Sequence, residues 1–243
     1  MNQFTVSLAG IPIGVSVLHA STMRFCRDYI TDEAPAFSVT LSQSLIDAER
    51  ERSYRQDQRE GIPRRHYSDA YLEPLALYRA IAGPLLEYDT VIFHGSVLAA
   101  EGQAYLFTAP SGTGKTTHAQ LWLRNIPNAH VLNGDKPLLR IREGQVLACG
   151  TPWQGKENYG RNEILPLKAI CILERARENH IEEIGIGDAL GVLIQQIHRP
   201  DQPDALLKTM NLLGKLGSSL RLYRLGCNME AEAAWISYRG MSQ

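Results

Sequence analysis

The stretch that decides the fold is Ala109-Pro110-Ser111-Gly112-Thr113-Gly114-Lys115-Thr116, followed by Thr117. It follows the phosphate-loop pattern G-x-x-x-x-G-K-[ST], except that Ala109 stands at the first glycine position. The apolar segment Tyr105-Leu106-Phe107 before it favours a strand, and residues 116–125 after it favour a helix. A strand, loop and helix of this kind turn backbone N–H groups and the positive helix end toward phosphate oxygens. The pattern therefore predicts a nucleoside triphosphate site.

The loop residues have separate expected roles. We expect Lys115 to reach the β- and γ-phosphates and the Thr116 hydroxyl to bind Mg²⁺. Guanine-binding proteins carry N-K-x-D, whereas Asn133-Gly134-Asp135-Lys136 has a different order, so ATP is favoured over GTP. The residues expected to bind the nucleotide are Ser111, Gly112, Thr113, Gly114, Lys115, Thr116 and Thr117.

A carboxylate follows the next apolar strand. Asp135 comes shortly after Val131-Leu132, where it would meet Mg²⁺ or a substrate hydroxyl, so we expect it to act as catalytic base and metal ligand. The alternative is a turn-forming aspartate before Pro137. The neighbouring Lys136 is either a phosphate contact or an ordinary surface lysine.

Residues 150–166 are rich in glycine, proline and aromatic residues and predict a loop. Lys156 and Arg161 follow Gly155 and Gly160, which would let the backbone approach a ligand. Both cations are candidates for a substrate or transition-state phosphate site, and Arg161 is favoured as catalytic because a guanidinium grips phosphate with two hydrogen bonds. Solvated loop charges are the alternative.

The order and spacing of His94-Gly95, the phosphate loop and Asp135 resemble the catalytic domain of HPr kinase/phosphorylase. The loop is also similar to that of phosphoenolpyruvate carboxykinase, and the resemblance covers roughly residues 88–240. It implies Mg²⁺-dependent phosphoryl transfer from ATP, and a role for His94 near the γ-phosphate or the attacking group. Without the resemblance, a single histidine in a strand is typical of a core residue.

The sequence also departs from that family. Where the family has paired aspartates, Gly134 takes the first place and Asp135 the second. The E-x-R-G-x-G-I signature of the bifunctional enzymes is missing, and residues 150–161 lie near its position. The first 90 or so residues are unlike that family's N-terminal domain. The resemblance therefore supports phosphoryl transfer but not HPr as the acceptor.

These features predict an α/β fold: a P-loop kinase of the HPr kinase and phosphoenolpyruvate carboxykinase type, with an N-terminal α+β elaboration. We expect an N-terminal region over 1–88, packed on a kinase core over 89–243. The expected N-terminal elements are a hairpin over 4–18, a helix over 21–31 and a strand over 36–41. The charged stretch 49–66 predicts a solvated helix that runs into a loop at Gly61-Ile62-Pro63, and a further helix is expected from Ser68 to Asp89. The expected core strands are 91–100, 104–108, 131–132, 138–141, 146–149, 168–174 and 220–225, with helices over 116–125, 188–197, 204–216 and 230–238.

The composition excludes several classes of function. The chain has 243 residues with 25 Lys and Arg against 26 Asp and Glu, a balance that argues against bulk-charge binding to nucleic acid or an anionic membrane. No signal peptide and no apolar run of membrane-spanning length is recognised. The 4 cysteines are scattered without a C-x-x-C pair, so no zinc site is expected, and free thiols favour the cytoplasm.

The function hypothesis is an ATP-dependent kinase. It would transfer the γ-phosphoryl group to an acceptor hydroxyl, on a serine of a small protein or peptide or on a small metabolite. The alternative is a non-catalytic nucleotide-dependent switch or a slow ATPase. Whether the chain forms a homo-oligomer is left open by the sequence.

Overall fold

The computed structural model describes residues 2–200 and 202–243. Contacts between residues divide the chain into two compact units, Met1–Leu85 and Leu86–Gln243. Both units combine helices with a β-sheet, so the protein is of the mixed α/β class.

The first unit contains a small sheet with the strand order β3-β1-β2-β4. A hairpin of β1 (Asn2–Leu8) and β2 (Ile11–Val17) forms its centre, flanked by β3 (Ile30–Thr31) and β4 (Phe37–Thr40). The hairpin turn between β1 and β2 is short. Ala9 and Gly10 alone make it, with φ of 54° and 70°, values that suit the right-handed twist of paired strands. Pro12 consequently lies inside β2, opposite Ser7.

Three α-helices complete the first unit: α1 (Ala20–Phe25), α2 (Gln43–Arg59) and α3 (Asp69–Leu85), with a short 3₁₀ helix η1 (Arg27–Tyr29) after α1. The charged helix predicted from Glu49 begins earlier, at Gln43, and ends at Arg59, before the predicted loop at Gly61. Most of α2 is exposed, but Glu49 is buried and pairs with Arg79 at 2.5 Å. Ser68 caps α3, because the Tyr71 N–H donates to Ser68 Oγ at 3.3 Å.

A fully buried carboxylate holds the start of α1. Glu73, on α3, accepts hydrogen bonds from the Leu18 N–H (2.6 Å), the His19 N–H (3.1 Å) and the Thr22 hydroxyl (2.5 Å). Leu18 and His19 precede α1 and Thr22 lies in its first turn, so Glu73 fixes the entry to this helix from α3.

The second unit is built on a sheet with the order β5-β9-β10-β11-β7-β6-β8, with β13 beside β11 and β12 beside β13. Strands β7, β11 and β13 run parallel, and β8 runs the same way because β6 is antiparallel to both β7 and β8. The carboxyl ends of these four strands therefore lie at one edge. The strands are β5 (Thr90–Ile92), β6 (Ser96–Ala100), β7 (Gln103–Thr108), β8 (His130–Asn133), β9 (Leu138–Arg142), β10 (Gln145–Cys149), β11 (Ile164–Arg175), β12 (His180–Ile184) and β13 (Arg221–Cys227).

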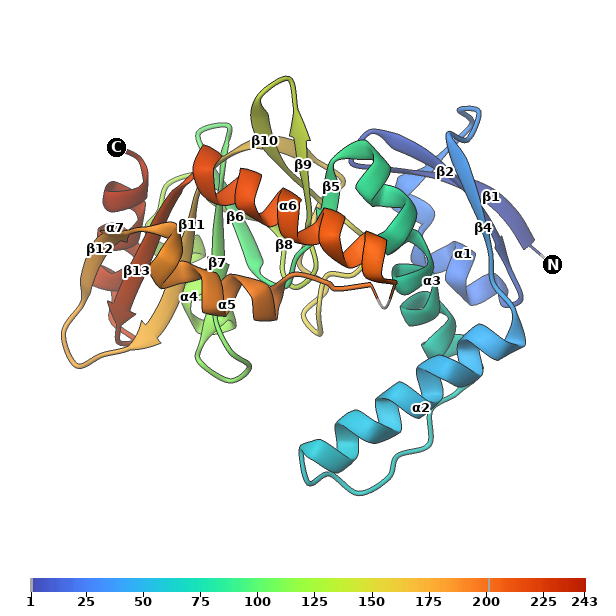
Figure 1. Ribbon diagram of the computed structural model, residues 1–243. Coiled ribbons are helices and arrows are strands. Elements are labelled where there is room, and N and C mark those ends of the chain that lie inside the picture. Colours follow the sequence, from blue (N-terminus) through green and yellow to red (C-terminus); the bar gives the residue numbers. More distant parts are fainter. Residues whose placement is uncertain (1, 201) are drawn as a thin grey trace. The chain divides into compact units, whose positions relative to one another are not determined.

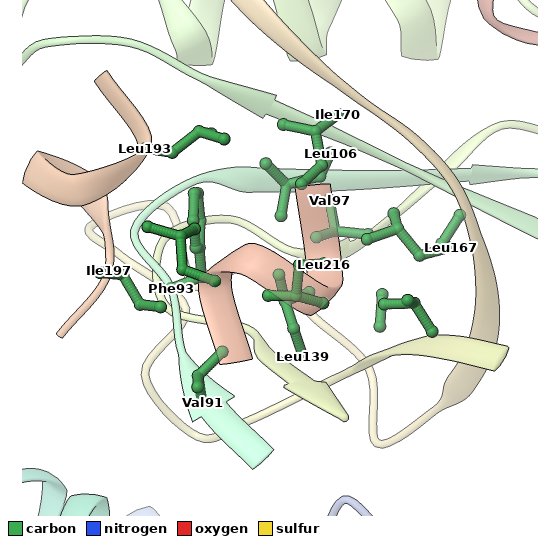
Figure 2. Packing of buried hydrophobic residues seen from close by; sticks show 14 of the residues in the cluster. Val91, Phe93, Val97, Leu106, Leu139, Leu167, Ile170, Leu193, Ile197 and Leu216 are labelled. Carbon is green, nitrogen blue, oxygen red and sulfur yellow. The ribbon is translucent and has the colours of Figure 1, made fainter. Parts of the chain in front are cut away.

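Helices cover both faces of this sheet (Figure 1). Alternate residues of each strand face opposite sides, so Leu106 and Ile170 pack with the helices α5 and α6, while Phe107 and Cys171 pack with α4 and α7. Figure 2 shows the first of these cores, in which strand residues gather with Leu193 of α5 and Leu216 of α6. The helices are α4 (Lys115–Asn125), α5 (Ile186–Gln196), α6 (Pro203–Ser219) and α7 (Ala231–Met241), preceded by the 3₁₀ helix η2 (Leu86–Tyr88).

The single strand predicted over 91–100 is wrong. Residues 93–95 separate β5, which pairs with β9, from β6, which pairs with β7 and β8. At this break the His94 N–H donates to Gln196 O (2.8 Å) and the Gly95 N–H donates to Asp135 O (2.9 Å). A Cβ at Gly95 would lie 2.9 Å from Phe107 O, so only glycine fits there.

Two other expectations in the second unit need correction. The loop predicted over 150–166 ends earlier, because β11 begins at Ile164 and Pro166 lies opposite Leu147 of β10. Strand β12 was not predicted, since the two exposed glutamates at its centre interrupt the alternation of apolar and polar residues. The expected strands at 104–108, 131–132, 138–141, 146–149 and 220–225 are confirmed, as are the four helices. Within the described residues, every helix is too short or too polar to cross a membrane.

Candidate functional site

The 109–117 segment connects β7 to α4 at the carboxyl edge of the sheet. Gly112 and Gly114 have φ of 78° and 127°, values that side-chain-bearing residues rarely adopt. Ala109 lies instead at the buried end of the strand, and its methyl group packs in the core with Phe107 and Trp122. Glycine is therefore present at the two positions whose backbone requires it, 112 and 114. The alanine that departs from the pattern, Ala109, lies where its methyl group can be packed.

Lys115 is the first residue of α4. Its Nζ donates to Ala109 O at 2.8 Å and so bridges the two ends of the segment. Burial lowers the pKa of Lys115, and the charges of Asp135 and Lys136 also act on it in opposite directions. Asp135 and Lys136 therefore lie close enough to Lys115 for their charges to act on it. The side chains of Thr116 and Thr117 are exposed, so a ligand can reach them.

Asp135 lies between two nitrogen groups. Its Oδ1 is 3.3 Å from His94 Nε2, and its Oδ2 accepts a hydrogen bond from Lys136 Nζ at 2.8 Å. Burial alone would raise the pKa of Asp135, but the His94 hydrogen bond and the charge and hydrogen bond of Lys136 hold it well below its ordinary value. Asp135 is therefore a carboxylate anion at neutral pH. The alternative of a mere turn residue is weakened by these side-chain contacts.

The Asp135 turn is held by two residues that the sequence analysis did not select, Asn133 and Thr151. Asn133 Oδ1 accepts hydrogen bonds from the backbone N–H groups of Asp135 (3.0 Å) and Lys136 (2.8 Å). Its Nδ2 donates to Thr151 Oγ1 (3.0 Å), and the Thr151 hydroxyl donates to Lys136 O (2.7 Å). Asn before Gly-Asp is a recognisable turn signal, but the partner 18 residues away is not visible locally.

His94 is fixed by its backbone rather than by membership of a strand. The Thr108 hydroxyl, at the end of β7, donates to His94 O at 2.9 Å. Together with the Gln196 and Asp135 contacts of residues 94 and 95, this bond places the imidazole beside Asp135, with about one third of the side chain exposed.

The 150–163 loop packs against the end of β8 through backbone hydrogen bonds. Gly134 N–H donates to Tyr159 O (3.0 Å), Lys136 N–H to Trp153 O (3.2 Å), and Arg161 N–H to Leu132 O (3.0 Å). The side chain of Trp153, on the same loop, is buried.

Lys156 and Arg161 are exposed on the 150–163 loop. Among the described residues, no ion pair or side-chain hydrogen bond joins either of them to His94, Lys115 or Asp135. The structure thus places His94, Lys115, Asp135 and Lys136 close together. Lys156 and Arg161 form no such contact with this group.

Gly134 explains why a single carboxylate stands here. A Cβ at this position would lie 2.6 Å from Gln154 O and 3.2 Å from Tyr159 O, both backbone atoms of the 150–163 loop. An aspartate at 134 would therefore force this loop away. The paired aspartates of the family that the sequence resembles are incompatible with the loop packing of this chain.

Arg175, at the end of β11, is a further residue that the sequence analysis did not place at the site. Its Nη2 donates to Gly112 O at 2.6 Å and its Nε to Thr113 O at 3.3 Å. These two hydrogen bonds from Arg175 hold the backbone of the 109–117 segment in place. The long separation in sequence, between adjacent parallel strands, hides this contact from local patterns.

The donor atoms present suit Mg²⁺ held jointly with a phosphate ligand. The described residues contain no cluster of three or more His, Cys, Asp and Glu side chains that would hold a metal by themselves. Mg²⁺ is usually bound by one or two carboxylates together with substrate phosphates, and Thr116 and Asp135 offer oxygen atoms of the required kind.

Comparison with known proteins gives limited information. No protein-family model matches the chain, and no curated protein matches it. Among solved structures, the HPr(Ser) kinase/phosphatase from Coxiella burnetii is similar at 7% sequence identity, covering 61% of this chain and 95% of that chain, with a TM-score of 0.36. At this level the similarity by itself assigns neither a fold family nor an activity. The function must be argued from the residues.

Proposed function

We propose that this protein is an ATP-dependent kinase that binds Mg²⁺-ATP at residues 111–117 and phosphorylates an acceptor hydroxyl beside Asp135. The observation that carries the proposal is the Asp135 carboxylate, held between His94 and Lys136 at the same sheet edge as the 109–117 segment. Phosphoryl transfer depends mainly on positioning and on neutralising phosphate charge, and this cluster offers both.

Each residue has a distinct role in this proposal. Backbone N–H groups of the 109–117 segment and Lys115 would hold the phosphates, and Lys115 would exchange its bond to Ala109 O for a phosphate oxygen. Thr116 and Asp135 would hold Mg²⁺, which supplies charge neutralisation when bound. Asp135, kept ionised by its neighbours, would accept a hydrogen bond from the acceptor hydroxyl and orient it.

The remaining cations would serve the acceptor side. His94 and Lys136 flank Asp135, so they would face the transferred phosphoryl group. Lys156 and Arg161 lie on the exposed 150–163 loop and would contact a bulky acceptor, such as a serine-containing peptide or small protein, more readily than a buried metabolite. The cytoplasm, where ATP is plentiful, is the proposed compartment.

Calorimetry with Mg²⁺-ATP tests the central claim. We expect Lys115→Ala to lose most ATP affinity while remaining folded, because its charge acts on the phosphates and its side chain is only half-buried. Lys215→Ala, on α6, is the matched control and should bind as the wild type does. Equal ATP binding by Lys115→Ala and the wild type would refute the proposal.

A transfer assay separates the kinase from the alternative functions. γ-Labelled ATP incubated with a panel of hydroxyl compounds and seryl peptides should place label on an acceptor. Label released only as inorganic phosphate would indicate a slow ATPase, and ATP binding with no turnover under any condition would indicate a nucleotide-dependent switch.

A further inference from the structure

A pocket of about 500 Å³ lies beside the 109–117 segment, on the side away from Asp135. Its volume is in the range typical of small-molecule sites. The outer side of residues 110–113 forms one wall, the last residues of β11, Ile172–Arg175, form another, and Val192 of α5 completes it. The roles described above use residues 111–113 for phosphate binding, and they assign no ligand to the space that these residues enclose with β11 and Val192.

The strand order aligns the pocket with the proposed phosphate site. Strands β8, β7 and β11 point the same way, and the order β11-β7-β6-β8 puts β8 and β11 on opposite sides of β7. Asp135, the 109–117 segment and Arg175 therefore follow one another along the carboxyl edge. A triphosphate lying on the segment with its γ-phosphate toward Asp135 directs its nucleoside toward β11. Ligands of open α/β sheets characteristically lie along such an edge.

The Arg175 side chain offers a flat surface in this pocket. Its hydrogen bonds to Gly112 O and Thr113 O come from Nη2 and Nε, which form one edge of the planar guanidinium group. Bonds made in the plane at one edge leave the faces of the group available. Guanidinium faces stack well on aromatic rings, and a nucleobase is such a ring.

The other walls have the character that a nucleobase requires. Pro110, Ile172 and Val192 present apolar surface. Glu174 also lines the pocket and pairs with Arg224 at 3.2 Å, a guanidinium that it shares with Glu182. The pocket thus combines apolar walls with the planar guanidinium group of Arg175, which is hydrogen-bonded to the 109–117 segment.

We propose that this pocket is the nucleoside site, in which the purine base stacks on the Arg175 guanidinium and packs against Pro110 and Val192. The inference rests on the proposed function, because it places the base of the nucleotide whose phosphates lie on residues 111–117. It gives Arg175 two tasks, which are to brace the segment and to bind the base.

The experiment compares two probes, Mg²⁺-ATP and Mg²⁺-tripolyphosphate, by calorimetry on the full chain. Tripolyphosphate carries the phosphates without a base. Val192→Trp fills the pocket and should weaken ATP binding by roughly tenfold or more, the scale of one lost base-stacking contact, while tripolyphosphate affinity stays unchanged. Leu190→Trp, an exposed position on the same helix that does not line the pocket, is the matched control and should leave both affinities unchanged.

A second variant keeps the inference testable if Val192→Trp does not fold. Arg175→Lys retains a cation for the carbonyl groups of the 109–117 segment but removes the flat guanidinium group. We expect it to weaken ATP binding more than tripolyphosphate binding. An equal loss of both probes would show that Arg175 only braces the segment and would overturn the stacking role.

The two proposals fail in different ways. Unchanged ATP affinity in Val192→Trp, with Lys115→Ala still losing both probes, would remove the nucleoside pocket and leave the phosphate site standing. If Lys115→Ala loses neither probe, the proposed function itself fails.

Discussion

His118 should make the second unit lose stability as the pH falls below neutrality. The imidazole is only 2% exposed, on α4 beneath the 109–117 segment, and its ring centroid lies 4.7 Å from that of Phe107. Nε2 lies 3.2 Å from Ser237 Oγ, whose own proton goes to Ala234 O, so the neutral tautomer that fits carries its proton on Nε2. In the described part of the chain Nδ1 has no hydrogen-bond partner. A second proton would therefore be buried without an acceptor.

Burial lowers the pKa of His118 from 6.5 to about 4. Between these two values the unfolded chain binds a proton that the folded chain does not, so the free energy of unfolding falls as the pH falls. A shift of about 2.5 pKa units corresponds to about 3 kcal/mol, with roughly half of it lost by pH 5.5. The contribution of His118 is fully present above pH 7 and gone below pH 4.

Urea unfolding followed by tryptophan fluorescence measures this effect, because all three tryptophans, Trp122, Trp153 and Trp235, lie in the second unit. The wild type should lose about 3 kcal/mol more than His118→Gln between pH 7 and pH 4. His180→Gln is the control, since an exposed imidazole is solvated in both states. Parallel profiles for the wild type and His118→Gln would refute the reasoning.

Three further outcomes are expected. Asp135→Asn should keep ATP binding and lower phosphoryl transfer roughly 10²–10⁴-fold, because the amide keeps the shape but cannot act as the anion, and near wild-type transfer in a single-turnover assay would exclude the role. Glu73→Ala should destabilise the first unit by roughly 2–4 kcal/mol, since the Thr22 hydroxyl and two N–H groups lose their acceptor. Hydrogen exchange of peptides from residues 2–85 measures this loss of stability, and Glu73→Gln should lose less stability than Glu73→Ala. Gly134→Ala should displace the loop at Gln154 and increase proteolysis of residues 150–163, whereas Gly83→Ala, where nothing lies within 4 Å, is the control; unchanged proteolysis would contradict the packing argument.

The sequence predicted the second unit best where a local pattern coincided with the actual structure. Glycines and the Gly-Lys-Thr sequence of the 109–117 segment have strong local preferences, and the apolar strand before it is buried on both faces. The boundary at His94 was missed because the apolar residues on both sides of His94-Gly95-Ser96 were read as one strand. Their division depends on which distant strand each half pairs with, β9 for one half and β7 for the other.

Long-range contacts also account for what was missed at the site. Thr151 and Arg175 act on residues that are distant in sequence, and neither has a local pattern that marks it. Asp135 and Lys115 were selected on sequence, and their mutual influence follows from the parallel directions of β7 and β8. Whether Lys156 and Arg161 contribute to an acceptor site stays a prediction, because it depends on a molecule that binds the exposed loop.

The way the 150–163 loop is attached leaves its exposed side chains free to change, whereas Thr151 and Trp153 are buried. The base of the loop is closed by the hydrogen bond from Gly150 N–H to Glu163 O at 2.9 Å, and beyond it Cys149 pairs with Ile164. The bonds that dock the loop on β8 use carbonyl and N–H groups, which nearly every amino acid supplies. Exchanging the exposed side chains, or grafting a different loop onto the two neighbouring strand ends, would alter the exposed surface of the loop and leave the 109–117 segment intact. Chains that share this scaffold can therefore differ in the surface that the loop presents.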